Sequence, residues 1–150
     1  MRQISLWDEN ARLAKLSELG DALERLNKVI NWEMFRPKSV KVFKKEAKGA
    51  GGRPPYDYVL LFKILVLQRI YNLSDEQTEY QINDRMSFMR FLGLGLSDRV
   101  PDAKTIWLFR DTLTKAAVMR ELFDLFNLSL RLYNMTKGLL RFATAPFGFY

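Results

Sequence analysis

Residues 52–70, GRPPYDYVLLFKILVLQRI, decide the fold of this chain. The two prolines restrict the backbone, so a helix cannot begin before them. Asp57 is placed to cap the helix that follows, and from Tyr58 to Leu67 only Lys63 interrupts the apolar side chains. A helix that is apolar on nearly every face is wrapped by other helices or spans a membrane, and this run has about half the length that a bilayer requires. We therefore expect a central core helix.

Length and composition indicate one domain, or one domain with an arm. Hydrophobic residues make up 48% of the 150 residues and aromatic residues 13%, which is enough to fill a core. The chain contains no cysteine and no histidine, which excludes disulfides, thiol catalysis, zinc sites with Cys or His ligands and a histidine general base. The N-terminus lacks the apolar core of a signal peptide, so we expect a soluble cytoplasmic protein without a membrane partner.

Helical patterns occupy the other segments, without strand-like alternation longer than a few residues, so the predicted fold class is all-α. Leucines recur at three- and four-residue steps through residues 8–35. Gly20 and Asp21 divide this segment into two helices, with Asp21 as the cap of the second. Further along, Ser74 and Gln77 have the spacing of a capping box, which predicts the start of another helix.

The segment after residue 36 is expected to form a short basic helix. We expect Pro37 to end the preceding leucine pattern. Residues 38–47 then carry lysines between apolar positions, and Val40 and Phe43 are predicted to face inward.

Composition divides the chain into three parts. We assign residues 1–50 to N-terminal helices and a basic arm, residues 51–135 to a helical core, and residues 136–150 to an atypical apolar tail. The sequence KGAGG at residues 48–52 is the predicted hinge between the arm and the core.

Positive charge is concentrated in the basic arm. The segment from Arg36 to Arg53 has one acidic residue, Glu46, and a local net charge of +6, so the rest of the chain contributes only +1 of the total of +7. Such a segment is typical of a polyanion-binding surface, most often for nucleic acid, although a solvated linker has the same composition. The candidate phosphate contacts are Arg36, Lys38, Lys41, Lys44, Lys45, Lys48 and Arg53.

Three short predicted helices in residues 74–116 resemble a helix-turn-helix arrangement. Asp84 and Asp102 are the expected N-caps of the second and third, and the third would be the recognition helix. Its first turn would approach a phosphate or a base edge with the help of the helix dipole. Its candidate DNA contacts are Lys104, Thr105, Trp107, Leu108, Arg110 and Lys115.

Two of these side chains have an alternative interpretation. Leu108 stands among polar residues and suits contact with a thymine methyl group or with another protein. Trp107 and Leu108 can equally pack beneath the last helix, at residues 118–134, since large apolar residues are usually buried. Arg53, between a glycine and a proline, suits a minor-groove contact or a plain helix start.

The acidic residues of the core give little support for catalysis. Asp75, Glu76, Glu79 and Asp84 cluster on one short helix and suggest magnesium ligands, but helix capping and a solvated face explain them as well. The sequence has no phosphate-binding Gly-Lys-Ser/Thr loop and no serine or cysteine nucleophile with a base.

Five further blocks of sequence stand out in order along the chain. They are GRPPYD (52–57), LFKILVLQR (61–69), YNLSDEQTEYQINDR (71–85), SFMRFLGL (87–94) and VPDAKTIWLFR (100–110). Together these blocks resemble the N-terminal region of bacterial insertion-sequence transposases of the fifth insertion-sequence class. The resemblance covers roughly residues 6–126 and is densest from Gly52 to Arg110.

The resemblance implies a helical domain that binds the ends of the element and precedes a nuclease core of the ribonuclease-H type. In the intact family that core has an Asp-Asp-Glu triad and two divalent metal ions, Mg. No acidic residue follows Asp124, so none of these catalytic carboxylates can be placed on this sequence. We therefore expect a truncated transposase with no catalytic residue and no cofactor of its own, and enzymatic activity is uncertain.

The predicted function is double-stranded DNA binding at the terminal inverted repeats of an insertion sequence, which implies association with the nucleoid. One alternative is an interaction module that forms homo-oligomers, or hetero-oligomers that inhibit full-length transposase, through the aromatic residues of the tail. Another is a helix-turn-helix regulator, for which a ligand-binding or dimerisation domain is not apparent in the sequence.

Overall fold

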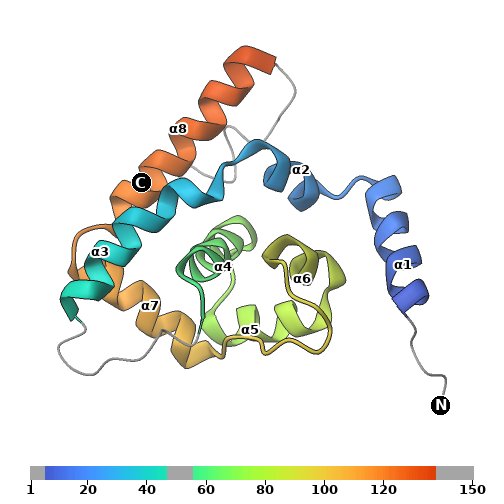
Figure 1. Ribbon diagram of the computed structural model, residues 1–150, viewed down its shortest axis with the longest axis horizontal. Helices are drawn as coiled ribbons and strands as arrows, with labels where there is room; N and C mark the ends of the chain where they lie inside the picture. Colours follow the sequence, from blue (N-terminus) through green and yellow to red (C-terminus); the bar gives the residue numbers. More distant parts are fainter. Residues whose placement is uncertain (1–5, 47–55, 138–150) are drawn as a thin grey trace.

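Eight α-helices and one 3-10 helix build residues 6–46 and 56–137, the part of the chain that the computed structural model describes (Figure 1). No strand occurs in these two ranges, so the all-α prediction is confirmed. The helices are α1 (Leu6–Leu19), α2 (Ala22–Val29), η1 (Trp32–Phe35), α3 (Arg36–Glu46), α4 (Tyr58–Tyr71), α5 (Asp75–Asp84), α6 (Met86–Leu92), α7 (Ala103–Lys115) and α8 (Met119–Lys137). None of the described helices has both the length and the apolar composition needed to cross a membrane.

Helix α4 is the centre of the fold, as its sequence predicts. Its N-cap is Asp57, whose carboxylate accepts a hydrogen bond from the backbone N–H of Leu60. Most of its side chains are buried, from Val59 through to Gln68. The elements η1, α3, α5, α6 and α7 all contact it, and Figure 1 shows it enclosed by them. Because the neighbouring helices cover the apolar side chains of this run, which only Lys63 interrupts, the helix forms the interior of the domain.

A cluster of aromatic rings joins the N-terminal helices to the core. The ring centroids of Phe35 and Phe62 are 4.4 Å apart, and Trp32 lies 5.5 Å from Phe91 and 5.8 Å from Phe126. These rings come from η1, α4, α6 and α8. The segments on either side of residues 47–55 therefore share one hydrophobic core.

The helix boundaries with local sequence signals are confirmed. Gly20 adopts a left-handed backbone conformation (φ +96°) between α1 and α2, and Asp21 caps α2 with its carboxylate. Ser74 and Gln77 form the reciprocal capping box at the start of α5. Asp102 caps α7. Each of these signals satisfies free backbone N–H groups within a few residues of itself, which is why the sequence alone reveals it.

Two expectations about helix boundaries, at Pro37 and Asp84, and one about the inward face of α3 are wrong. Pro37 lies in the first turn of α3 and does not end the preceding helical pattern, because a proline there lacks only an N–H that would have no helical partner. The predicted inward face of α3 is right for Phe43, which packs against the core, and wrong for Val40, which is exposed while Val42 is buried. Asp84 is the last residue of α5, and Arg85 occupies the N-cap position of α6 without a side-chain hydrogen bond.

Candidate nucleic-acid interface

The basic helix α3 packs directly against α7, the predicted recognition helix. The ring of Phe43 stacks on that of Phe109 with centroids 5.3 Å apart, and on that of Tyr58 at 4.8 Å. Contacts between α3 and α7 accompany this stack, and Figure 1 shows the two helices at the same end of the molecule. The two sets of predicted DNA contacts, far apart in the sequence, therefore belong to neighbouring elements.

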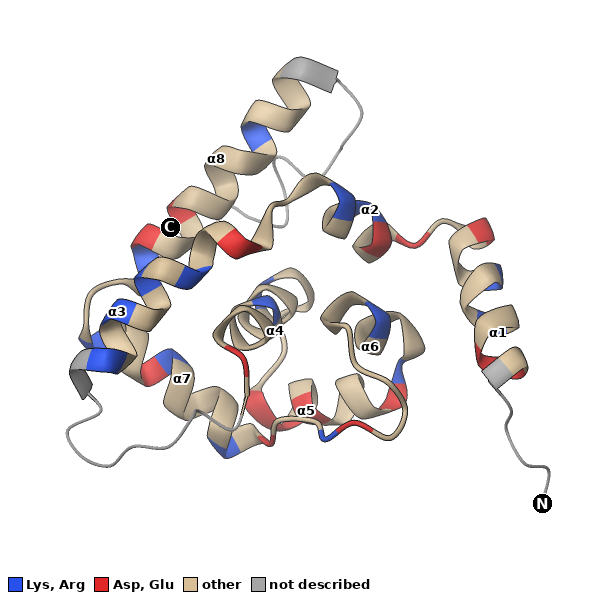
Figure 2. Ribbon diagram, viewed as in Figure 1, with Lys and Arg blue, Asp and Glu red and all other residues tan. Residues whose placement is uncertain are grey.

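Basic residues recur along α3, as the blue segments of its ribbon in Figure 2 mark. Lys41 and Lys44 are exposed, and within the described residues neither takes part in an ion pair. Lys38 forms an exposed ion pair with Glu121 of α8 at 2.9 Å, which contributes little energy because water screens it. Their ammonium groups are therefore accessible to an external anion.

Arg36 has a different environment from these lysines. Its guanidinium group donates to Glu33 at 2.7 Å and also binds the carboxylate of Asp57, the N-cap of α4. These hydrogen bonds raise the pKa of Arg36 above its ordinary value. Arg36 thus connects the start of α3 to the start of α4, and a phosphate would have to compete with two carboxylates for it.

Three of the predicted arm contacts lie outside the described part of the molecule. Lys48 and Arg53 fall in residues 47–55, as does the predicted hinge, and the side chain of Lys45 is likewise not described. Residues 138–150, most of the predicted tail, are also outside this part.

The outer face of α7 carries an apolar pair between two lysines. Trp107 is 48% exposed and Leu108 is 53% exposed, so the alternative that both pack beneath α8 is wrong. Lys104 and Lys115 are exposed near the two ends of the helix, and the ammonium group of Lys115 lies 2.8 Å from the carboxylate of Asp111. This face offers cationic and apolar contacts together.

Arg110, the remaining predicted contact on α7, points into the protein. Its guanidinium nitrogens bind the two carboxylate oxygens of Asp75 at 2.6 and 2.8 Å, and one of them also donates to Oε1 of Gln68 at 3.0 Å. Gln68 in turn donates to Asp75 at 2.7 Å. The hydrogen bonds from Arg110 are the main reason that the pKa of Asp75 lies below its ordinary value. Arg110 therefore connects α7 to α4 and α5.

The N-terminus of α7 is already occupied by carboxylates. Asp102 accepts a hydrogen bond from the backbone N–H of Thr105 at 2.8 Å, and Glu79 of α5 accepts one from the N–H of Ala103 at 2.6 Å. A phosphate at this helix end would meet two negative charges. The backbone N–H groups of Ala103 and Thr105 therefore already have acceptors, and the exposed side chains of α7 are what remains as candidate contacts.

These contacts also explain part of the acidic cluster. Asp75 binds Arg110, and Glu79 caps α7, so two of the four carboxylates considered as magnesium ligands hold neighbouring helices together. Within residues 6–46 and 56–137, no group of three or more potential ligands converges on one point.

A family model described as Transposase domain (DUF772) matches residues 11–112, which is more than half of the chain. The chain belongs to this transposase domain family. No solved structure matches the chain. The matched range begins within α1 and ends within α7, so it includes the whole packed assembly of α2 to α6.

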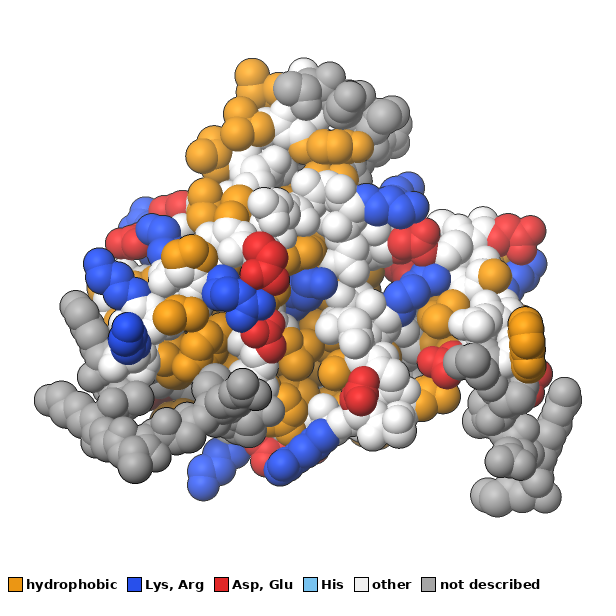
Figure 3. Space-filling view, viewed as in Figure 1, with side chains coloured by type: hydrophobic (Ala, Val, Ile, Leu, Met, Phe, Trp, Pro, Cys, Tyr) orange, Lys and Arg blue, Asp and Glu red, His pale blue; other side chains and the backbone are white. Residues whose placement is uncertain are grey.

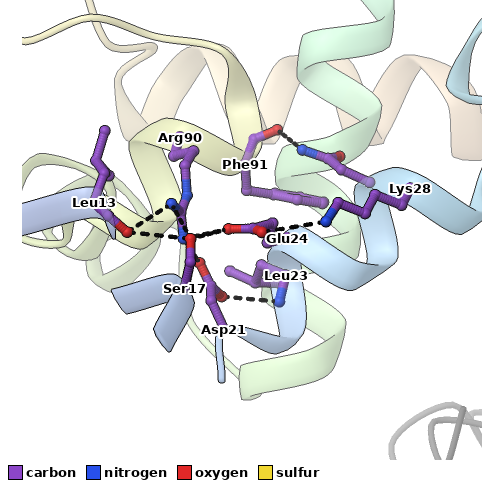
Figure 4. Close-up of polar contacts among 9 residues, drawn as sticks. Leu13, Ser17, Asp21, Leu23, Glu24, Lys28, Arg90 and Phe91 are labelled. Atoms are coloured by element: carbon purple, nitrogen blue, oxygen red, sulfur yellow. Dashed lines mark hydrogen bonds and ion pairs between the residues drawn. The ribbon is translucent and has the colours of Figure 1, made fainter. Parts of the chain in front are cut away.

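Within this transposase domain, Arg90 of α6 holds α1 and α2 in place (Figure 4). One guanidinium nitrogen donates to the backbone carbonyl of Leu13 and to the hydroxyl of Ser17, each at 2.9 Å. Another lies 2.6 Å from the carboxylate of Asp21 and 3.0 Å from that of Glu24. Because four protein acceptors surround this guanidinium, Arg90 is a structural residue and not a surface cation.

Sequence reasoning missed the roles of Arg90 and Glu79. The only local signal for Arg90 is a charged residue within the apolar run FMRFL, at residues 88–92, where an arginine needs a buried or half-buried partner. Glu79 has no comparable signal, because its partner is a backbone N–H on another helix.

Proposed function

We propose that this transposase domain binds double-stranded DNA at the terminal inverted repeats of an insertion sequence of the fifth class, through the surface formed by α3 and α7. The packing of Phe43 on Phe109 is the observation that carries the proposal. This packing brings α3, with its accessible lysines, beside α7, whose exposed face carries both lysines and large apolar side chains. On this basis the protein would reside with the nucleoid.

The lysines of α3 supply the sequence-independent part of the binding. Lys41 and Lys44 are exposed and project from a helix that is anchored on the core through Phe43 and Val42. A lysine that neutralises a DNA phosphate releases a condensed counterion, so affinity falls steeply as the salt concentration rises. Such contacts position the protein on the duplex without selecting a base sequence.

The exposed face of α7 supplies the sequence-dependent part. A single α-helix fits the major groove, where thymine presents its methyl group and guanine two acceptors. On this helix Leu108 is suited to the methyl group, while Lys104 and Lys115 are suited to phosphates or guanine. Arg110 and Glu79 hold the helix at a fixed orientation against α5, as the recognition helix of a helix-turn-helix unit requires.

A fluorescence titration with duplexes of the element's end sequence and a shuffled duplex tests the proposal. The double variant Lys41→Ala/Lys44→Ala should weaken binding to both duplexes alike and reduce the slope of log K against log salt by about 2. The control Lys15→Ala/Lys28→Ala removes the same charge from α1 and α2 and should leave the slope unchanged. Affinity that does not depend on salt would overturn the proposal.

A second pair of variants separates recognition from general attraction. Leu108→Ala should reduce the preference for end DNA over shuffled DNA by about tenfold while leaving the salt slope intact. Leu96→Ala, an exposed leucine in the turn before α7, is the matched control. Equal preference in both variants would contradict the assignment of sequence reading to α7.

A further inference from the structure

The two helices that pack beside α7 carry opposite charge. Helix α3 has the sequence RPKSVKVFKKE, with five basic residues and one acidic residue, a net charge of +4. Helix α5 has the sequence DEQTEYQIND, with four acidic residues and no basic residue, a net charge of −4. Both helices contact α7, and Figure 3 shows basic side chains gathered over α3, at the left of the view. A polyanion that approaches α7 therefore meets attraction from one neighbour and repulsion from the other.

Part of the acidic charge of α5 is turned toward α7. Asp75 and Glu79 hold α7 through the hydrogen bonds described above. Glu76 and Asp84 are exposed, and within the described residues neither of them forms an ion pair. Even with Arg85, the residue that follows the helix, the net charge of this segment is −3. The outer surface of α5 is therefore unfavourable for phosphates.

The neighbouring helices divide the exposed face of α7 into two edges. Phe109 stacks on Phe43 of α3, whereas Arg110 binds α5. Because an α-helix turns once in about 3.6 residues, Leu108 lies on the edge next to α3 and Trp107 on the edge next to α5. The edge with Leu108 thus adjoins the lysines, and the edge with Trp107 adjoins the carboxylates.

We propose that the bound duplex lies across α3 and the adjoining edge of α7, and that α5 stays clear of the DNA backbone. This inference rests on the proposed function and specifies the direction in which the duplex leaves α7. In the usual docking of a helix-turn-helix unit, the helix that precedes the recognition helix crosses the backbone. Here that helix would be α5, whose exposed carboxylates would face phosphates. Charge complementarity favours the side of α3 instead, so α5 supports α7 without touching DNA.

The packing of α3 fixes where its lysines lie relative to Leu108. Lys41 and Lys44 are three residues apart and share one face of α3, on the side away from the buried Val42. The ring of Phe43, between them in the sequence, stacks on α7 and holds this face beside the reading helix. Phosphates bound by the lysines and the bases reached by Leu108 therefore belong to adjoining parts of one duplex.

DNA cleavage by a tethered iron–EDTA group tests the direction of the duplex. The chain contains no cysteine, so one introduced cysteine gives a single attachment site in the full chain. Iron–EDTA attached at Val40→Cys, on α3, should cut the end duplex at discrete positions, whereas attachment at Tyr80→Cys, on α5, should not. Tyr80 is 66% exposed and Val40 39%, so poor access would not explain a lack of cutting from α5. Leu19→Cys, on α1, measures the background.

The outcomes separate this inference from the proposed function. Equal cutting from the Val40→Cys and Tyr80→Cys tethers, or no cutting above background from Val40→Cys, would overturn the inference while salt-dependent binding of the wild type upholds the proposed function. Salt-independent affinity of the wild type would overturn both. Circular dichroism spectra of the tethered variants should match that of the wild type, because all three substituted side chains are exposed.

Neutralising α5 provides a second measurement that needs no tether. Glu76→Gln/Asp84→Asn should change the affinity for end DNA by less than twofold at about 0.15 M salt and leave the salt slope unchanged, because charges beyond the Debye length of about 8 Å are screened. The matched variant Lys41→Ala/Lys44→Ala alters two charges on α3 and should reduce the slope by about 2. A larger gain in affinity on neutralising α5, or a changed slope, would mean that the duplex lies against that helix and would refute the inference.

Discussion

The junction of α7 with α5 and the outer surface of α3 use basic residues in opposite ways. At the junction, Arg110 binds Asp75 with two nitrogens and Gln68 with one, and its side chain is half-buried. On α3, the ammonium groups of Lys41 and Lys44 face solvent. The sequence predicts DNA contact for all three residues, whereas in the structure Arg110 holds helices together and the two lysines remain available.

The chemistry of the two side chains accounts for the difference. A guanidinium group is planar and matches a carboxylate with two parallel hydrogen bonds, so it suits a fixed site between helices. An ammonium group on a flexible stem keeps its hydration and acts as a point charge. The comparison predicts that arginine substitutions here lower stability, while lysine substitutions lower the affinity for a polyanion.

Arg110→Ala should give the largest effect. It leaves the carboxylate of Asp75 without its main partner, and we expect the free energy of unfolding to fall by about 3 kcal/mol. Urea denaturation followed by circular dichroism measures the change. Arg25→Ala, an exposed arginine of α2, should change stability by less than about 0.5 kcal/mol. If the two variants lost equal stability, the structural role of Arg110 would be disproved.

The pH dependence of stability should reveal the same junction with a smaller effect. The pKa of Asp75 lies below its ordinary value because Arg110 donates to it, so the folded protein holds this proton less tightly than the unfolded chain. Its stabilising contribution is therefore fully present above the unfolded pKa of about 3.9 and is lost as the pH falls through the lower pKa of the folded state.

Unfolding measured from pH 7 to pH 3 checks this expectation against Asp75→Asn. The variant should be less stable than wild type at pH 7, and the two should converge toward pH 3. A stability difference that stays constant over this range would show that the carboxylate charge of Asp75 is not what stabilises the junction.

The smallest effect on stability is expected at α3. Lys41→Ala/Lys44→Ala should alter the free energy of unfolding by less than about 0.5 kcal/mol, because both side chains are exposed and alanine favours a helix. A thermal melt of the same protein used for the DNA titration provides the measurement. A large loss of stability would remove the contrast between the two regions and would make any loss of DNA binding ambiguous.

The features that were predicted from the sequence have causes within a few residues. Asp57, Asp102 and the Ser74–Gln77 capping box each satisfy backbone groups in the adjacent turn. The burial of α4 follows from its own apolar run. Such signals do not depend on the rest of the fold.

The features that were missed depend on partners distant in the sequence. Arg110 and Asp75 are 35 residues apart, and Arg90 and Asp21 are 69 apart, so only the packed fold shows that they meet. The position of Pro37 was ambiguous for a different reason, since a proline both ends helices and begins them. A helical repeat also does not show which apolar residues remain exposed. The burial of Trp107 and Leu108 therefore depends on the neighbours of α7, which the sequence alone does not give.

The half-exposed indole of Trp107 gives the domain an intrinsic optical probe. The other two tryptophans have different surroundings, because Trp32 is enclosed by aromatic rings and Trp7 is exposed on α1. Stacking or contact with nucleobases would change the emission of Trp107 and leave that of Trp32 constant. In a Trp7→Phe variant, the ratio of these two emissions would thus report, without a label, whether α7 is the helix that approaches DNA.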